Sequence, residues 1–165
     1  MKRNIQEDIR AFQCDITTDK LVEEVGLDSV NIITCIFVLS AIHPEKHQQV
    51  NLPAMRSPSK LATQVLRNLA AVLAPGGVLL FRDYGLYDMA QIRFKSGSKI
   101  SENFYTRQDG TRSYFFSAEE VKRLGEEAGL ESYHSEMVER RTVNIKEGID
   151  VPRNFVQSKF RKKKI

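Results

Sequence analysis

The chain has few of the residues that serve as nucleophiles or metal ligands. Its 165 residues include two cysteines, three histidines and no tryptophan. Neither Cys14 nor Cys35 belongs to a CxxC or CxxH pair, so we expect buried thiols in a reducing compartment. His43 and His47 are four residues apart, but no third ligand lies near them, and the sequence therefore predicts no zinc site.

Several longer patterns are also absent. The nine glycines include no G-x-G, and the chain has no P-loop and no G-x-S-x-G motif. These absences argue against P-loop nucleotide hydrolysis and against acyl transfer by an activated serine. There is no apolar run of about 20 residues and no signal peptide, so we expect a soluble intracellular protein without a membrane partner.

Length and composition fit one globular domain. The apolar content is 41%, which suits a packed core in a chain of 165 residues. The net charge of +4 and the pI near 9.1 are compatible with an anionic partner but do not require one.

One stretch, residues 77–88, combines the strongest strand signal with an abrupt change to charge. Residues 78–81 are apolar without polar alternation, which is the pattern of a parallel strand covered on both faces. Arg82, Asp83 and Tyr84 follow directly. In an open α/β sheet, ligands bind just beyond the carboxyl ends of the strands. We therefore favour a functional role for these three residues over a structural turn.

The rest of the chain alternates strands and helices, which indicates an α/β layered fold with a largely parallel sheet. Predicted strands cover residues 9–14, 30–38, 130–138 and 154–160, and predicted helices cover 17–24, 60–73 and the segment after a capping box at 117–120. Residues 30–38 are apolar on both faces and are expected to be central. The last two strands are joined near Gly148 without a helix, so they should be antiparallel neighbours.

The residues that follow the first two predicted strands each allow two interpretations. Asp15 follows the first predicted strand, where an acidic residue can accept a hydrogen bond from a ribose hydroxyl or an adenine amino group. Aspartate is also a good N-cap for a helix that begins near Thr17, and the residues do not decide between the two. Residues 37–40 close the second strand, where they would line a cofactor pocket, although composition favours core packing.

Aromatic residues and arginines are interleaved over residues 103–116. Asp109 and Gly110 indicate a β-hairpin turn in this segment. The mixture suits stacking on exposed bases and contact with phosphates, but a hairpin that packs its aromatic face on the sheet explains it equally well. The basic run at 161–164 is typical of a solvated tail; as a functional element it would add salt-dependent affinity for nucleic acid.

Four strings of residues carry a resemblance to a known family. They are Ile-Phe-Val-Leu-Ser-Ala-Ile-His-Pro at 36–44, Phe-Arg-Asp-Tyr-Gly-Leu-Tyr-Asp at 81–88, Glu-Asn-Phe-Tyr at 102–105 with Arg-Gln-Asp-Gly-Thr-Arg-Ser-Tyr-Phe-Phe at 107–116, and Gln-Ser-Lys-Phe at 157–160. They resemble the methyltransferase-like tRNA 3-methylcytidine methyltransferases, and the similarity runs over about residues 12–160.

The resemblance implies a class I S-adenosylmethionine-dependent α/β fold. Such a fold has a Rossmann-like seven-stranded sheet in the order 3-2-1-4-5-7-6, with helices on both faces. It implies methyl transfer from S-adenosylmethionine to N3 of a cytidine in a tRNA anticodon loop. The implied partners are tRNA and an aminoacyl-tRNA synthetase, with no DNA, and the implied compartment is the cytoplasm, with the nucleus as a second candidate.

The resemblance also assigns roles to individual positions. The cofactor-binding candidates are Asp15 and Ile16 at the adenine and Ile36 and Phe37 at the pocket floor. The catalytic candidates at the target cytosine are Asp83, Tyr84 and Arg140. The residues themselves, rather than the resemblance, give the RNA-binding candidates, which are Arg82, Arg107 and Arg112.

The chain departs from the family pattern in two places. The family's first strand, its Gly-rich turn, the acidic residue after the next strand and the N-terminal tRNA-contacting segment have no counterpart here. We therefore expect residues 1–165 to form a single partial methyltransferase domain, with strands 3 to 7 of the family's sheet and a basic tail at 161–165. Without the first strand, the strand at 30–38 would expose an apolar edge. Residues 51–60, which contain two prolines, are expected to be an inserted loop that splits a helix.

Two hypotheses of different classes follow. The first is an S-adenosylmethionine-dependent tRNA methyltransferase that forms 3-methylcytidine. The second is a catalytically inactive relative that binds RNA or a protein through residues 103–116 and the basic tail. Binding of the cofactor separates the two.

Overall fold

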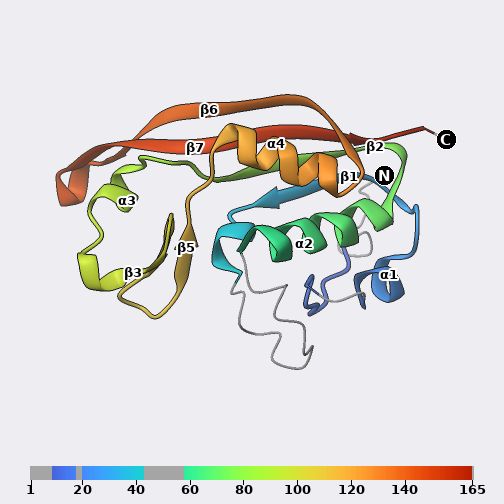
Figure 1. Ribbon diagram of the computed structural model, residues 1–165, viewed down its shortest axis with the longest axis horizontal. Helices are drawn as coiled ribbons and strands as arrows, with labels where there is room; N and C mark the ends of the chain where they lie inside the picture. Colours follow the sequence, from blue (N-terminus) through green and yellow to red (C-terminus); the bar gives the residue numbers. More distant parts are fainter. Residues whose placement is uncertain (1–8, 18–19, 43–57, 165) are drawn as a thin grey trace, which may run out of the picture.

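The computed structural model describes residues 9–17, 20–42 and 58–164. They form one four-stranded mixed sheet, one three-stranded sheet, and helices packed against the larger sheet (Figure 1). The elements are α1 (Lys20–Val25), β1 (Val30–Ile36), η2 (Leu39–Ala41), α2 (Pro58–Val72), β2 (Leu73–Tyr84), α3 (Met89–Ile92), η5 (Ser96–Ser98), β3 (Lys99–Ser101), β4 (Phe104–Thr106), β5 (Arg112–Tyr114), α4 (Ala118–Glu127), β6 (Leu130–Asn144), η6 (Ile145–Glu147) and β7 (Ile149–Lys162).

The larger sheet has the strand order β1-β2-β7-β6. β1 and β2 are parallel, whereas β7 is antiparallel to both β2 and β6. This order is the 4-5-7-6 half of the sheet that the family resemblance implies, so the expected class I α/β fold is confirmed. The prediction that the last two strands are antiparallel neighbours is confirmed as well. The prediction of a largely parallel sheet is wrong for the described residues, because only the β1–β2 pair is parallel.

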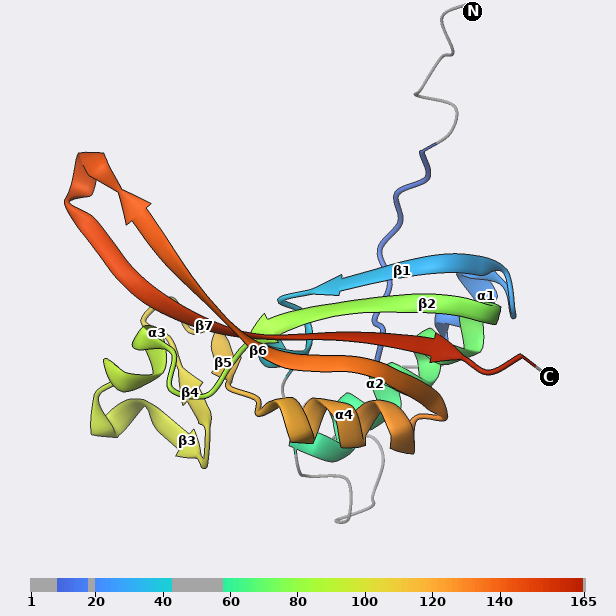
Figure 2. The same cartoon turned by 90° about the horizontal axis from the view of Figure 1, so that it is seen from above.

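The core lies between one face of the sheet and two helices. α2 and α4 cover the same face, as both views show (Figures 1 and 2). Leu61, Val65, Leu69 and Val72 recur at helical spacing and give α2 its apolar side. Ser117 caps α4, because its hydroxyl accepts a hydrogen bond from the backbone N–H of Glu120 at 3.0 Å. The fully buried side chains from these elements include Val65, Leu66, Val72, Leu73, Leu79, Phe81, Val121, Leu124, Val156 and Phe160.

β1 lies at the edge of the sheet, so the prediction that this strand is central is wrong. Among the described residues it pairs only with β2. Its outward side chains Ile32 and Ile36 are 63% and 51% exposed, and Leu80 of β2 is 37% exposed on the same face. The expected exposed apolar edge is therefore present. An apolar sequence shows that a strand would be stabilised by burial between neighbouring strands. It does not show that a second neighbouring strand is present.

Residues 9–14 form no strand, and this prediction is also wrong. A strand is stable only beside a hydrogen-bonded neighbour, and no described strand runs along this segment. Ile9 and Phe12 are accordingly exposed. The prediction of a helix at 17–24 corresponds to α1, which begins later, at Lys20.

β2 begins earlier than predicted. α2 ends at Val72, as the glycine and proline after it suggested, but the sheet starts at the next residue. Leu73 pairs with Val30 and Val78 with Ile32, so the register is irregular between them, and Gly76 takes a φ of +79° there. Residues 74–77 are thus a bulged part of the strand rather than a separate turn.

The two hairpins after β2 differ in size. β4 and β5 pair around Asp109 and Gly110, so the predicted hairpin is confirmed, and β3 adds a third strand. β6 and β7 pair as far as Asn144 with Ile149, well past the last pair that β7 makes with β2. The β6–β7 hairpin therefore projects beyond the sheet (Figure 2). Both strands are longer than predicted.

The segment after residue 160 is partly ordered into the sheet. β7 runs through Lys162, whose ammonium group contacts the Asp28 carboxylate at 2.6 Å and the Ala70 carbonyl at 2.7 Å.

The predicted insertion at 51–60 lies largely outside the described residues, which resume at Pro58. Within the described residues, no helix is long and apolar enough to cross a bilayer.

The contact between α4 and β7 gives a stability prediction. A Cβ built on Gly125 would lie 2.2 Å from Cε1 of Phe160, a fully buried ring. We expect Gly125→Ala to lower the free energy of unfolding by about 1–3 kcal/mol through overpacking, although alanine favours a helix over glycine. Urea denaturation measures this. Gly97→Ala is the control, because no atom lies within 4 Å of its Cβ position. Equal midpoints for the two variants would contradict the close contact.

Candidate functional site

The site is built where β1 and β2 end together. Because the strands are parallel, their carboxyl ends meet at one edge of the sheet, with Ile36 opposite Arg82. The backbone N–H of Phe37 donates to the Arg82 carbonyl at 2.9 Å. Phe37 has a φ of +56°, which is uncommon for a residue other than glycine. This turn lays its ring on Tyr84, with 5.0 Å between the centroids and 29° between the planes.

Asp83 is fully buried directly beneath this pair. Its Oδ2 accepts a hydrogen bond from the backbone N–H of Ser40 at 3.0 Å, and its Oδ1 accepts one from the N–H of Tyr84 at 2.8 Å. Burial raises the pKa of the Asp83 carboxyl, and the hydrogen bonds from Ser40 partly oppose the shift. The carboxylate thus ties η2, which follows β1, to the end of β2.

Cys35 lies beside Asp83 in the core and is no candidate nucleophile. Burial, and secondarily the charge of Asp83, raises the pKa of the Cys35 thiol to about 12. The thiol is therefore protonated at neutral pH, whereas a reactive cysteine needs the thiolate.

The residues Arg82, Asp83 and Tyr84 do not form one cluster. Side chains alternate between the faces of a strand, so Asp83 points into the core with Phe81, while Arg82 and Tyr84 point to the opposite face, which no described helix covers. The Arg82 guanidinium lies 4.5 Å from the ring centre of Phe155, and its Nη1 is 3.5 Å from Oε1 of Gln157. The uncovered face thus carries the basic and aromatic part of the site.

Aromatic rings from three other parts of the chain surround Tyr84. Besides Phe37, the rings of Phe115 and Phe155 lie 5.9 and 6.3 Å from it, centroid to centroid. The guanidinium of Arg107 lies 5.0 Å from the same ring. Arg107 comes from the small sheet, so this sheet is part of the site.

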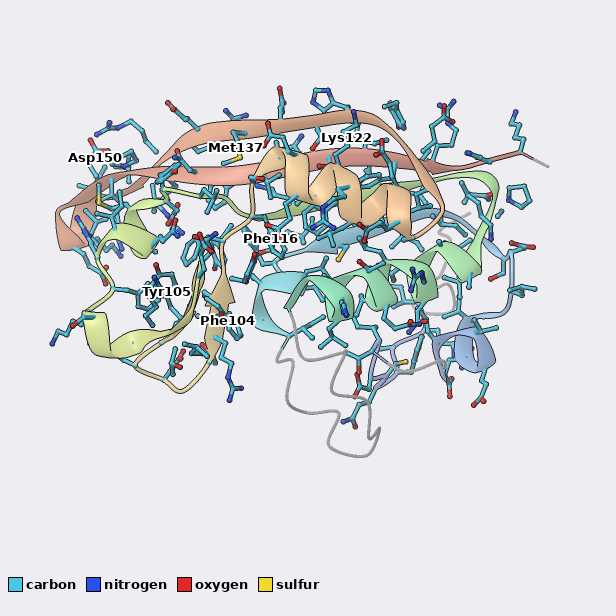
Figure 3. All side chains as sticks on the ribbon, in the orientation of Figure 1. Phe104, Tyr105, Phe116, Lys122, Met137 and Asp150 are labelled. Carbon is cyan, nitrogen blue, oxygen red and sulfur yellow. The ribbon has the colours of Figure 1, made fainter. Side chains whose placement is uncertain are left out.

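The small sheet is joined to the larger one through Phe116. Its backbone N–H donates to the Tyr84 carbonyl at 2.9 Å, and its ring meets Phe81 edge to face at 6.2 Å. Figure 3 shows Phe104 and Tyr105 on the small sheet and Phe116 beside the larger one. The aromatic residues at 103–116 thus pack within the protein, while Arg107 remains at the surface of the Tyr84 cluster.

Asp15 and Ile16 lie apart from the strand ends, beside α2. The Asp15 carboxylate accepts hydrogen bonds from the N–H and the hydroxyl of Thr17, at 3.0 and 2.6 Å. The Ile16 carbonyl accepts one from the Asn68 side chain in α2 at 3.0 Å. Of the four cofactor candidates, only Ile36 and Phe37 are at the carboxyl end of β1, where both are exposed.

In the described part of the chain, neither Arg112 nor Arg140 contacts the Tyr84 ring. Arg112 is on β5, opposite Thr106. Arg140 is on the projecting part of β6, directly opposite Arg153 of β7, where it is exposed and donates to the Glu139 carbonyl at 3.0 Å. Of the predicted site residues, Phe37, Tyr84 and Arg107 are therefore in direct ring contact, and Arg140 is their neighbour through the β6–β7 register.

Sequence reasoning missed Asp88 and Arg153. Asp88 is fully buried and accepts from Nε of Arg153 at 2.8 and 3.1 Å and from the N–H of Asn154 at 2.8 Å. It also caps α3 by accepting from the N–H of Ala90. A cap signal for Asp88 was visible in the sequence, but Arg153 is 65 residues away and only the strand register brings it here.

No metal centre is visible in the described ranges: they hold no group of three or more histidine, cysteine, aspartate or glutamate side chains that could bind an ion.

Comparisons with known proteins give consistent matches. A family model described as a methyltransferase domain matches residues 5–135. The tRNA N(3)-cytidine methyltransferase METTL6 of Mus musculus is 53% identical over 156 residues, which are 94% of this chain and 50% of that protein. The tRNA N(3)-cytidine methyltransferase METTL2 of Danio rerio is 46% identical over 92% of this chain and 39% of its own length. The chain thus spans about half the length of the curated relatives it matches.

Solved structures agree on the fold. A SAM-dependent methyltransferase from Anabaena variabilis superposes with a TM-score of 0.59 at 12% identity, over 96% of this chain and 62% of that one. The 1,6-didemethyltoxoflavin-N1-methyltransferase of Burkholderia thailandensis, solved with S-adenosylhomocysteine, gives a TM-score of 0.55 at 15% identity, over 95% and 52% of the two chains. At these identities the likeness concerns the fold alone.

The raised pKa of Asp83 predicts an unusual pH dependence. In the unfolded chain, the Asp83 carboxyl titrates near its ordinary pKa of 3.8. On acidification, the folded protein therefore takes up a proton at Asp83 at a higher pH than the unfolded chain does. The free energy of unfolding of the wild type, relative to Asp83→Asn, should therefore rise as the pH falls from 7 towards 4. The gain is about 1.4 kcal/mol for each unit by which the two pKa values differ.

Urea denaturation at several pH values measures this difference. Asp109→Asn is the control, because hydrogen bonds from Thr111 lower the pKa of the exposed Asp109 carboxyl and the slope should have the opposite sign. A relative stability of the wild type that is flat or falls on acidification would contradict the argument.

Proposed function

Because the chain belongs to the methyltransferase domain family, we propose that it is the catalytic part of an S-adenosylmethionine-dependent tRNA methyltransferase that forms 3-methylcytidine in the anticodon loop. The names of the curated relatives support the choice of tRNA and of the cytidine N3 atom. The observation that carries the proposal is the Phe37–Tyr84 stack over Asp83 at the joint carboxyl ends of β1 and β2.

The residues at this site suit a reaction without proton abstraction. N3 of cytosine carries a free lone pair at neutral pH, so no general base is required. The cofactor, when bound, supplies an electrophilic methyl group. What remains for the protein is to hold the base in line with that group, which by itself contributes a large part of the rate. The absence of a nucleophile motif and the protonated thiol of Cys35 are consistent with this chemistry.

The partly exposed aromatic cluster suits recognition of an unpaired base, with Phe37 exposed and Tyr84 half-buried. Phe37 and Tyr84 are stacked at the edge of the sheet, and Arg82 and Arg107 lie against neighbouring rings. RNA loops are recognised by stacking on such rings and by arginine contacts to the backbone. A target in the anticodon loop is accessible without opening a duplex. We assign Tyr84 to the target base and keep Arg112 as an RNA-contact candidate. Arg140, a catalytic candidate by the family resemblance, lies directly opposite Arg153 in the β6–β7 register, and we keep it as a candidate beside the target base.

Asp83 serves this site from inside the core. The family resemblance implies a place for Asp83 at the target cytosine, but both carboxylate oxygens accept backbone N–H groups and the side chain is fully buried. We assign Asp83 to fixing the backbone of Ser40 and Tyr84.

The cofactor candidates fit the strand end in part. Ile36 and Phe37 offer exposed apolar surface where an adenine ring packs well. Asp15 and Ile16 complete the candidate set from beside α2.

We also propose a cytoplasmic location, with the nucleus as the second candidate, and an aminoacyl-tRNA synthetase as protein partner. The family resemblance alone supports these two proposals.

Calorimetric titration with S-adenosylmethionine tests the cofactor assignment. We expect Asp15→Asn to weaken binding about tenfold or more, since a hydrogen bond to a charged group contributes about 1.5–3 kcal/mol. Asp109→Asn is a matched control, because Asp109 accepts from the N–H and hydroxyl of Thr111 just as Asp15 does from Thr17. The control should leave the affinity within twofold. A folded chain that does not bind, or an equal loss in both variants, would refute the assignment.

Product analysis tests the reaction itself. The chain is incubated with S-adenosylmethionine and an unmodified tRNA transcript, and the digested nucleosides are examined by mass spectrometry. We expect 3-methylcytidine to form, and Tyr84→Ala to abolish it by removing the ring beside the target base. Binding of tRNA without any methylated product would instead favour the alternative, a catalytically inactive RNA-binding module.

A further inference from the structure

Two arginines from distant parts of the chain are anchored in the same way. Nε of Arg107 donates to the Ser113 hydroxyl at 2.6 Å, and Nε of Arg153 donates to the Asp88 carboxylate at 2.8 Å. Both acceptors are completely buried. Arg107 follows β4 and Arg153 is on β7, so the small sheet and the main sheet each contribute one guanidinium.

The anchored guanidiniums leave their outer nitrogens available. Each guanidinium has five N–H donors, and the anchor uses the one at Nε. In the described part of the chain, no residue accepts a hydrogen bond from the Nη atoms of Arg107 or Arg153. An arginine held at Nε is pre-organised, because its fork can bind an oxyanion with little further loss of side-chain freedom.

Both forks lie at the ring of Tyr84. The guanidinium carbons of Arg107 and Arg153 are 5.0 and 5.7 Å from its centre. Arg153 is also 5.3 Å from the ring of Phe155, on whose ring Arg82 lies at 4.5 Å. Asp88 neutralises one of these three positive charges, so the surface around Tyr84 remains basic. It fits an anion with several oxygens.

We propose that Arg107 and Arg153 form a clamp for one phosphodiester group of the RNA, the one adjoining the nucleotide whose base lies at Tyr84. This inference rests on the proposed function, and it adds Arg153 and its anchor Asp88 to the site. Planar guanidinium forks match the geometry of phosphate oxygens. Because the two forks come from separate sheets, the clamp fixes the backbone of the target nucleotide as well as its charge.

Neutralising single linkages in the RNA tests the clamp. The probe is a fluorescent anticodon stem-loop RNA that has either all its phosphates or one neutral methylphosphonate linkage, placed 5′ or 3′ of the target cytidine. For the wild-type chain we expect one of these two changes to weaken binding roughly tenfold or more. Arg153→Gln should weaken binding of the all-phosphate RNA by a similar factor and should no longer respond to that methylphosphonate.

The chain offers a matched control and a second variant. Arg141 also pairs with a carboxylate through Nε, at 2.8 Å from Asp150, but lies on the exposed hairpin. Arg141→Gln should keep the wild-type response to the methylphosphonate. Since Arg153→Gln leaves Asp88 buried without its cation, thermal melts check that it folds. Arg107→Gln, which leaves only a neutral hydroxyl behind, provides the same comparison without that cost.

The outcomes separate the clamp from the proposed function. If the wild-type chain binds the RNA equally well with either neutral linkage, the clamp alone is overturned. The same holds if the arginine variants respond to the neutral linkages as the wild type does. That second result would indicate that the two guanidiniums bind a different anion, such as a carboxylate. A folded wild-type chain that binds neither RNA would overturn tRNA as the substrate, and the clamp with it.

Discussion

The buried carboxylate of Asp83 is the interaction on which the arrangement of the site depends. A charge removed from water is costly unless hydrogen bonds compensate for the lost hydration, and here the backbone N–H groups of Ser40 and Tyr84 compensate for it in part. This requirement fixes the segment after β1 against the end of β2. Phe37 lies between β1 and this fixed segment, and the backbone turns there with a φ of +56°. The stack on Tyr84 is thus flanked on the core side by a fixed backbone.

A second buried aspartate positions the other half of the site. Asp88 joins the N-terminus of α3 to β7 at the point where β7 leaves β2 and continues with β6 alone. The two aspartates therefore act in different ways: Asp83 aligns two parallel strand ends, and Asp88 brings a cation from an antiparallel strand to the same ring. Tyr84 lies between them, because it follows Asp83 directly and its ring faces Arg153.

Local signals in the sequence were sufficient to predict the strand that ends at the site, the hairpin at Asp109 and the N-cap at Ser117. They failed where structure depends on partners remote in sequence: residues 9–14 have strand-forming residues but no described neighbour to pair with. The alternation rule already implied that Asp83 faces away from Arg82 and Tyr84, so that separation was predictable. The contact between Arg153 and Asp88 was not, because it depends on the register of β7 against β2 and β6.

The uncovered face of the sheet and the site are one surface. Ile32 and Ile36 of β1 share this face with Leu80, Arg82 and Tyr84 of β2, since residues in register on parallel strands point the same way. Any segment or molecule that covers the exposed isoleucines therefore also lies against the Phe37–Tyr84 stack. Covering this face would remove water from the site, and the attraction between its guanidiniums and an anion would strengthen as the local dielectric constant falls. Apolar burial and substrate affinity are thus physically coupled on this face.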